Sequence, residues 1–166
     1  VTTEYDEARR QITETLEAVH AQEMPTLLFW PNVDAGSDGT SKGVRLFRER
    51  EKPKGFHFFR NMLPEDFLRL LCNCSCIVGN SSVAIRECAY LGVPAVNIGT
   101  RQSGRERGRN VIDVSYDRDE IAAALRVHNH NGRPASDPLY GDGQAGPRIA
   151  SQLAESELTI EKRLTY

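Results

Sequence analysis

Apolar residues in the first twenty positions recur at spacings of three and four among charged residues: Ala8, Ile12, Leu16 and Val19. That spacing puts them on one face of an amphipathic helix, which Thr2 or Thr3 caps and Pro25 ends. The same pattern predicts further helices at residues 41–51, 64–71, 83–91 and 119–127, and a final helix that begins at residues 147–153.

Short apolar runs alternate with these helices and predict strands at residues 26–30, 56–59, 74–78, 94–98 and 111–114. Polar segments rich in Gly, Pro, Asn and Asp, including residues 31–37 and 128–143, are typical of loops. Strands that alternate with helices form a parallel sheet covered on both faces, with right-handed crossovers. We therefore expect an α/β fold, a doubly wound, Rossmann-like domain over residues 1–155, followed by a charged tail at residues 156–166.

Composition narrows the possible partners. The 166 residues carry a formal net charge of −2, so nothing favours general binding to nucleic acid or to anionic membranes. No apolar run approaches the roughly 20 residues that cross a bilayer. The polar, acidic amino terminus does not resemble a signal peptide. We expect a cytoplasmic protein that binds neither membrane nor nucleic acid.

Four cysteines, Cys72, Cys74, Cys76 and Cys88, form a C-x-C-x-C pattern and one separate thiol. Zinc sites usually show C-x-x-C pairs, and no His lies close by in sequence. The pattern favours cysteines that pack as small apolar residues, and reduced thiols suit the cytoplasm. We expect no metal and no cofactor.

The segment VGNSSVAIRE, residues 78–87, follows a predicted strand and opens a predicted helix. Free N–H groups, the positive end of the helix dipole and the hydroxyls of Ser81 and Ser82 would together hold a phosphate. Glu87, a turn and a half into that helix, could accept hydrogen bonds from a ribose diol. The alternative is that a serine merely caps the helix and that Glu87 faces solvent. The pattern alone leaves both open.

Two more loops follow predicted strands. Residues 99–110 carry four arginines broken by three glycines, and arginine suits bidentate recognition of a diphosphate or carboxylate. A solvated loop whose arginines pair with Glu106 and other acids is the alternative. Residues 31–36 include Asn32, which can donate and accept hydrogen bonds. All three loops fall on the strand edge where open α/β sheets bind ligands, without a dinucleotide or Walker A fingerprint.

The segments FWPNVDAGS, VGNSSVAIRECAYLGVPAVNIGTRQSGRERGRNVIDV and LYGDGQAGPRI resemble the carboxyl-terminal domain of UDP-N-acetylglucosamine 2-epimerases. The resemblance runs from residue 1 to about residue 154. The GTRQ and GRERG stretches are similar to the hydrolysing branch, which makes N-acetylmannosamine for sialic-acid-type sugars. The resemblance implies one domain of a two-domain enzyme of the GT-B type, with UDP in the cleft between the domains.

By this resemblance, Asn32 contacts UDP and Arg101 lines the nucleotide site. Ser81 and Ser82 match the pair that holds the diphosphate, and Glu87 matches the ribose-binding acid. These roles agree with the phosphate and ribose roles argued above.

Arg45 and Arg48 lie one turn apart and share a helix face. In vertebrate members of the family, arginines at the matching places resemble an effector site for CMP-activated sialic acid. The preceding loop, residues 38–40, looks longer here than in those members, which favours a solvated basic face.

The family's reaction eliminates UDP and then adds water to the resulting glycal. Its acid/base groups come from the amino-terminal domain and from a His before a Pro at the domain junction. The four histidines of this chain, His20, His57, His128 and His130, do not match that His, so we assign no catalytic residue. The expected partners are UDP or UDP-N-acetylglucosamine, the amino-terminal domain and further copies in a homo-oligomer. The donor-binding domain of a GT-B glycosyltransferase and a non-enzymatic nucleotide-sugar sensor are the competing hypotheses.

Overall fold

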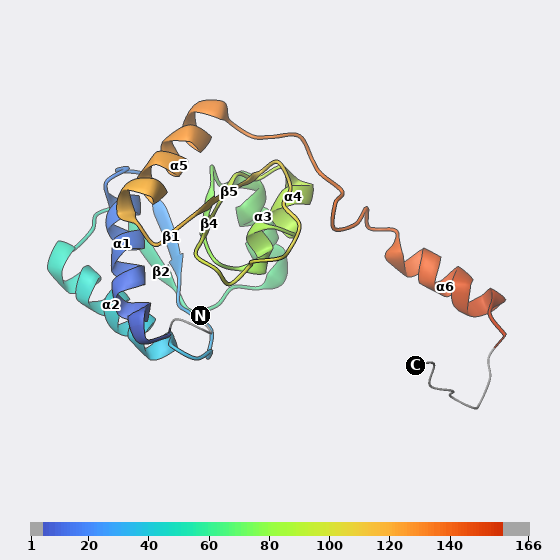
Figure 1. The fold of residues 1–166 in the computed structure, drawn as a ribbon, viewed down its shortest axis with the longest axis horizontal. Coiled ribbons are helices and arrows are strands. Elements are labelled where there is room, and N and C mark those ends of the chain that lie inside the picture. Colours follow the sequence, from blue (N-terminus) through green and yellow to red (C-terminus); the bar gives the residue numbers. More distant parts are fainter. Residues whose placement is uncertain (1–4, 158–166) are drawn as a thin grey trace.

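Strands and helices alternate along the chain (Figure 1) in a computed structural model that describes residues 5–157. The helices are α1 (Ala8–His20), α2 (Ser37–Glu51), α3 (Pro64–Asn73), α4 (Glu87–Leu91), α5 (Arg118–Asn131) and α6 (Ala145–Glu155), with short 3-10 turns η1 (Tyr5–Glu7) and η2 (Ser82–Ala84). The strands are β1 (Thr26–Phe29), β2 (Phe56–Phe59), β3 (Ile77–Gly79), β4 (Ala95–Ile98) and β5 (Val111–Val114).

All the strand pairs in the described residues are parallel, but they form two separate sheets. β1 pairs with β2, and β3, β4 and β5 form the second sheet with β4 in the centre. Every residue of β4 is buried, as expected for a strand covered on both faces. The predicted α/β class with parallel strands is confirmed. The predicted sheet is divided into a two-stranded and a three-stranded part.

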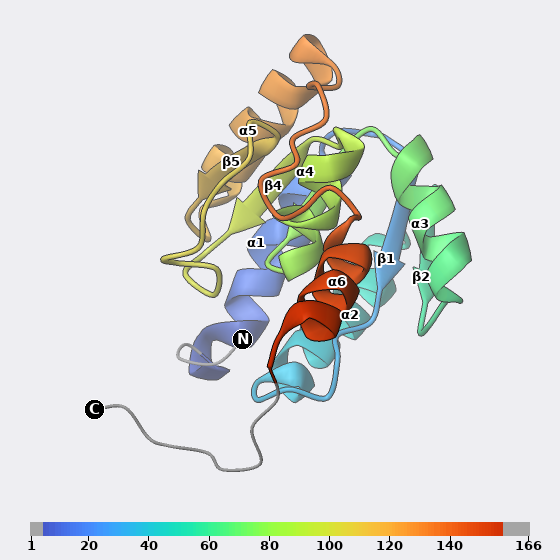
Figure 2. The same ribbon diagram turned by 90° about the vertical axis from the view of Figure 1, so that its right-hand side faces the viewer.

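Helix α1 packs against both sheets and so joins them. Leu16 lies in a core cluster with Phe47 and Phe56 over the first sheet, whereas Ala18 lies in a cluster with Val96 over the second. Helices α1, α2 and α5 cover this face, while α3 and α4 cover the other through a third cluster. Figure 2 shows α5 and α3 on opposite sides of the strands. This is the doubly wound arrangement.

Helix α2 begins at Ser37, four residues earlier than predicted, and includes residues 38–40, which were expected to be a loop. Two glycines on one face of α2 allow it to approach α1 closely. A Cβ atom on Gly43 would lie 2.4 Å from Cγ2 of Ile12, and one on Gly39 would lie 3.2 Å from Cβ of Ala8. Gly39, in the segment expected to be a loop, is therefore a packing position, as is Gly43 within the predicted helix.

The helix predicted at residues 83–91 is broken into η2 and α4. In a continuous helix the carbonyl of Ala84 would accept the N–H of Cys88. Instead the side chain of Asn110 donates to that carbonyl at 3.0 Å, and also to the carbonyl of Val93 at 2.9 Å. A long-range polar contact thus replaces the local one, and Glu87 becomes the first residue of α4.

Two other boundaries differ from the prediction. Helix α3 runs on to Asn73, so the strand predicted at residues 74–78 shifts to β3 and the alternating cysteines do not lie along a strand. Helix α5, capped by Asp117, extends to Asn131 and contains His128 and His130, which were expected in a loop. The ring of His128 is buried, with Nε2 3.1 Å from the carbonyl oxygen of Ala95.

Helix α6 stands apart from the rest of the molecule (Figure 1) and buries none of its residues. Its apolar residues Ile149 and Leu153 are about three-fifths exposed. The caps predicted at Thr2 or Thr3 and most of the tail predicted at residues 156–166 lie outside the described residues.

Replacing Phe47 by Ala should lower the free energy of unfolding by about 3–5 kcal/mol, because the ring fills the centre of the cluster between α1, α2 and β2. The neighbouring substitution Leu46→Ala is the control, since Leu46 is 47% exposed and should change stability by about 0.5 kcal/mol. Urea unfolding followed by circular dichroism measures both. Similar effects of the two substitutions would contradict this placement of the core.

Candidate functional site

Three loops from different strands lie at the carboxyl edge of the sheets: the asparagine loop (residues 31–36) after β1, the serine loop (residues 79–82) after β3, and the arginine loop (residues 99–110) after β4. The first and third loops meet directly, because Nη2 of Arg101 lies 3.4 Å from Oδ2 of Asp34. This contact joins the edges of the two sheets. The three loops follow the strands as predicted, and the roles of Asn32, Ser81, Ser82 and Arg101 stay predictions.

The serine loop turns at Gly79, whose φ is +145°. Ser81 has an extended backbone, and its Oγ accepts from the N–H of Val83 at 3.4 Å, a long hydrogen bond. Ser82 begins the single turn of η2. Because no long helix follows, a phosphate here would depend on hydroxyls and local N–H groups, and the full helix dipole that the sequence suggested is absent. Because Ser81 accepts from the N–H of Val83 at the start of η2, it agrees in part with the alternative that a serine merely caps the helix.

Glu87 is not the solvent-facing residue of the alternative interpretation. Its side chain is half-buried, and Oε2 is buried without a hydrogen-bond donor among the described residues. Unpaired buried carboxylate oxygens are rare because removing them from water costs free energy. A carboxylate held in this way beside the serine loop is suited to accept hydrogen bonds from a bound hydroxyl group.

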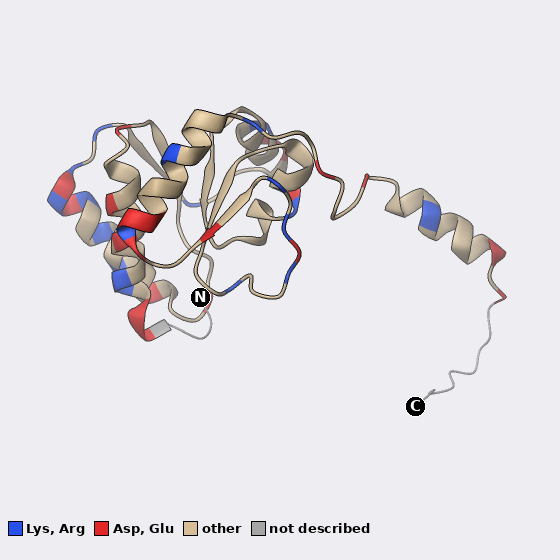
Figure 3. Cartoon of the chain, turned by 45° about the horizontal axis from the view of Figure 1, so that its top comes forward, with Lys and Arg blue, Asp and Glu red and all other residues tan. Residues whose placement is uncertain are grey.

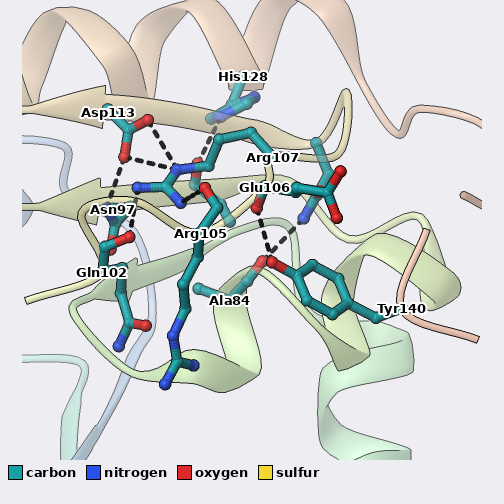
Figure 4. Close-up of polar contacts among 11 residues, drawn as sticks. Ala84, Asn97, Gln102, Arg105, Glu106, Arg107, Asp113, His128 and Tyr140 are labelled. Carbon is teal, nitrogen blue, oxygen red and sulfur yellow. Dashed lines mark hydrogen bonds and ion pairs between the residues drawn. The ribbon is translucent and has the colours of Figure 1, made fainter. Parts of the chain in front are cut away.

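The arginine loop is held by a network of hydrogen bonds around Asp113 (Figure 4). Nε of Arg107 donates to both carboxylate oxygens of Asp113, at 3.1 and 2.9 Å, and Nδ2 of Asn97 donates to Oδ1 at 2.6 Å. The other nitrogens of Arg107 donate to the carbonyls of Arg105 and Gln102. Arg107 thus serves the loop itself, whereas the side chain of Arg105 extends away from Asp113 (Figure 4).

These contacts set the charge state of Asp113. Burial alone would raise the pKa of its carboxyl group, but the hydrogen bonds from Arg107 and Asn97 outweigh burial and hold the pKa below its ordinary value. The carboxylate therefore stays ionised to a lower pH than an ordinary aspartate does.

Sequence reasoning missed several of these structural residues: Asn97, Gln102, Asn110, Asp113 and His128. One signal was available for two of them. Asn97 and Asp113 interrupt the apolar runs AVNI and VIDV. Asn97 lies in a buried strand, where a polar side chain needs a specific partner, whereas Asp113 is exposed on β5. The contacts of Gln102, Asn110 and His128 join residues far apart in the chain and carry no local signal.

Arg45 and Arg48 lie on one face of α2, as predicted, and each guanidinium lies over an aromatic ring. Arg45 is 5.9 Å from the ring centroid of Trp30 and Arg48 is 5.1 Å from that of Phe58. Cation–π contacts of this kind are worth about 0.5–1 kcal/mol at exposed sites. Figure 3 shows that basic and acidic residues alternate along the helices of this part of the molecule. The effector role of this pair stays a prediction.

The cysteines differ in exposure. Cys72 is exposed, Cys74 and Cys76 are half-buried, and Cys88 is buried in the third core cluster. Burial raises the pKa of the Cys76 and Cys88 thiols to about 12. Within residues 5–157, no group of His, Cys, Asp and Glu has an arrangement that could hold a metal ion. Over the same residues, no helix has the length and apolar character of a membrane span.

Comparison with known proteins identifies the family. The sequence profile of UDP-N-acetylglucosamine 2-epimerases matches residues 1–154. The chain belongs to this family. It is 29% identical over 143 residues to UDP-N-acetylglucosamine 2-epimerase of Neisseria meningitidis serogroup B, covering 86% of this chain and 37% of that protein.

A second relative is UDP-N,N'-diacetylbacillosamine 2-epimerase (hydrolyzing) of Legionella pneumophila, 28% identical over 148 residues, which cover 89% of this chain and 38% of that protein. The chain therefore spans less than two-fifths of the length of these relatives. Among solved structures, UDP-GlcNAc 2-epimerase from Methanocaldococcus jannaschii shares the fold, with a TM-score of 0.68 at 18% identity over 90% of this chain and 42% of that one.

Asp113 should make the stability of the chain depend on pH in the acid range. A carboxyl whose folded-state pKa lies below its unfolded value of 3.8 stabilises the fold above that value and loses this effect as the pH falls through the folded-state pKa. Asp113→Asn should therefore unfold with a weaker pH dependence as the pH falls below about 4. Asp119→Asn, at a carboxylate that is 92% exposed, is the control and should retain the wild-type profile.

Alkylation of the native chain with iodoacetamide should modify Cys72 first. Thiolates are the reactive form, and the pKa of about 12 together with burial protects Cys76 and Cys88. Peptide mass spectrometry after timed labelling measures the order, with urea-unfolded chain as the reference in which all four react. Rapid labelling of Cys88 in the native chain would contradict its burial.

Proposed function

We propose that this chain is the UDP-binding, carboxyl-terminal part of a hydrolysing UDP-N-acetylglucosamine 2-epimerase. The full enzyme would convert UDP-N-acetylglucosamine and water to N-acetylmannosamine and UDP, with a UDP-binding domain over residues 1–155. Family membership supports the reaction class, and the name of the Legionella relative supports the hydrolysing branch. The observation that carries the binding role is the buried, unpaired carboxylate oxygen of Glu87 beside the serine loop.

Each proposed contact follows from the chemistry of the site. The hydroxyls of Ser81 and Ser82 donate to diphosphate oxygens, which accept strong, charge-assisted hydrogen bonds. Arg101 supplies positive charge from the arginine loop. Its long contact to Asp34 is weak enough for a ligand to replace it. Glu87 accepts hydrogen bonds from the ribose hydroxyls, and Asn32 contacts the nucleotide from the asparagine loop.

The chemical step needs groups that this chain does not supply. Elimination of UDP and addition of water require an acid and a base within hydrogen-bond reach of the sugar. We assign no proton-transfer role to the carboxylates of this edge within residues 5–157, because Asp34 contacts Arg101 and Glu87 is proposed to bind the ribose. We propose that an amino-terminal domain supplies these groups and that the full enzyme is a homo-oligomer.

Calorimetric titration with UDP tests the binding role. Arg101→Ala and Glu87→Ala should each weaken UDP binding by about 1–3 kcal/mol, the loss expected for a hydrogen bond to a charged group. Arg126→Ala and Glu49→Ala are the matched controls, because both side chains are exposed and lie on helices away from this edge. These controls should bind UDP as the wild type does.

Two outcomes would count against the proposal. Absence of UDP binding by the wild-type chain, both alone and within its full natural reading frame, would exclude the nucleotide role. Epimerisation by the 166-residue chain alone would show that the catalytic groups lie within it.

A further inference from the structure

Gln102 is a buried polar side chain between two exposed neighbours, Arg101 and Ser103. Only 3% of its surface is exposed, although long amide side chains usually face solvent. Its Nε2 donates at 2.7 Å to the carbonyl of Asn80 in the serine loop. This is a direct hydrogen bond between the loop that carries Arg101 and the loop that carries Ser81 and Ser82.

The direction of this hydrogen bond is fixed. Oε1 of Gln102 is buried and has no donor among the described residues. Exchanging the amide oxygen and nitrogen would place Oε1 against the carbonyl oxygen of Asn80, and two acceptors repel each other. Gln102 therefore acts as a donor at this place, and a side chain of the same shape without an N–H cannot replace it.

The main chain of Gln102 is itself anchored. Its carbonyl accepts from Nη2 of Arg107 at 2.9 Å, and Arg107 is held by Asp113. Asp113 in turn accepts from Asn97, which is fully buried in β4. A continuous series of hydrogen bonds thus runs from the centre of the second sheet, through the arginine loop, to Asn80.

The hydrogen bond from Gln102 restricts the backbone of the serine loop at Asn80. The peptide unit is planar and trans, so the carbonyl of Asn80 and the N–H of Ser81 point in opposite directions in one plane. Holding the carbonyl fixes the direction of that N–H and the start of the Ser81 backbone. Gly79, with φ +145° and open space around its Cα, offers no side chain to restrict the turn.

We propose that Gln102 is a positioning residue of the nucleotide site, which sets the serine loop in the orientation that receives a diphosphate. This inference rests on the proposed UDP-binding function. It assigns Gln102 no contact with the ligand and no part in proton transfer. Arg101 and Gln102 are neighbours with separate tasks: the first faces the asparagine loop and the second holds the serine loop.

The first test compares two substitutions of similar shape. Gln102→Met fills the space without a donor, and Gln102→Glu places an oxygen against the Asn80 carbonyl. Titration of the isotope-labelled chain with UDP, followed by NMR, should show about tenfold weaker binding for Gln102→Met and binding at least as weak for Gln102→Glu. Ser103→Ala, at an exposed position in the same loop, should bind as the wild type does. Wild-type affinity in Gln102→Met would overturn the proposal.

The second test needs no ligand. Amide hydrogen exchange of residues 81–85 should be faster in Gln102→Met than in the wild type and in Ser103→Ala, while the amides of β4 stay protected. Equal exchange at residues 81–85 would overturn the positioning role, as would uniform acceleration throughout the chain, which indicates general destabilisation. If the wild type binds no UDP, the proposed function fails, and the exchange result still decides whether Gln102 orders the serine loop.

Discussion

The carboxylate of Asp113 is the fixed point of the arginine loop. It lies on β5, accepts from Asn97 on β4, and holds Arg107 through two hydrogen bonds. A twelve-residue loop with three glycines has much conformational entropy to lose, and charge-assisted hydrogen bonds of this kind are among the stronger ones available. This anchor adds to the turn hydrogen bonds within the loop in holding Arg101 at the sheet edge and Gln102 against Asn80.

The arginines of this loop differ in the contacts that their guanidinium groups make. Arg107 donates its hydrogen bonds to groups of the protein, so its guanidinium is paired internally and does not face a ligand. Within residues 5–157, Arg101 makes one long side-chain contact, 3.4 Å, to a half-exposed Asp34. The number of arginines in a loop therefore overstates the charge offered to a ligand. Within residues 5–157, Arg101 is the arginine of this loop whose guanidinium contacts a loop from the other sheet.

The parts of the fold that follow from local patterns could be predicted from sequence. Strands β2 and β5 agree with their apolar runs residue for residue, and α1 follows its spacing. Predictions failed where a distant side chain overrides the local preference. Asn110 takes the carbonyl that would continue the helix after Ala84, and α1 accommodates the glycines of α2 by close packing. The site loops were placed correctly because parallel strands end at one edge, whereas the Asp113 network depends on contacts between separate strands.

Four buried acceptors have no donor among the described residues: Oδ1 of Asn97, Oδ1 of Asn110, Oε1 of Gln102 and Oε2 of Glu87. The first three belong to side-chain amides whose nitrogens donate hydrogen bonds within the protein. Because the amide oxygen is bonded to the same carbon as the nitrogen, these contacts bury the oxygen as well. Glu87 differs, because a carboxylate has no donor to give and gains nothing from burial on its own. Internal structure therefore accounts for the three amides and leaves Glu87 unexplained. A bound hydroxyl group would supply the missing donor, which makes Glu87 the strongest structural argument for a ligand at this edge.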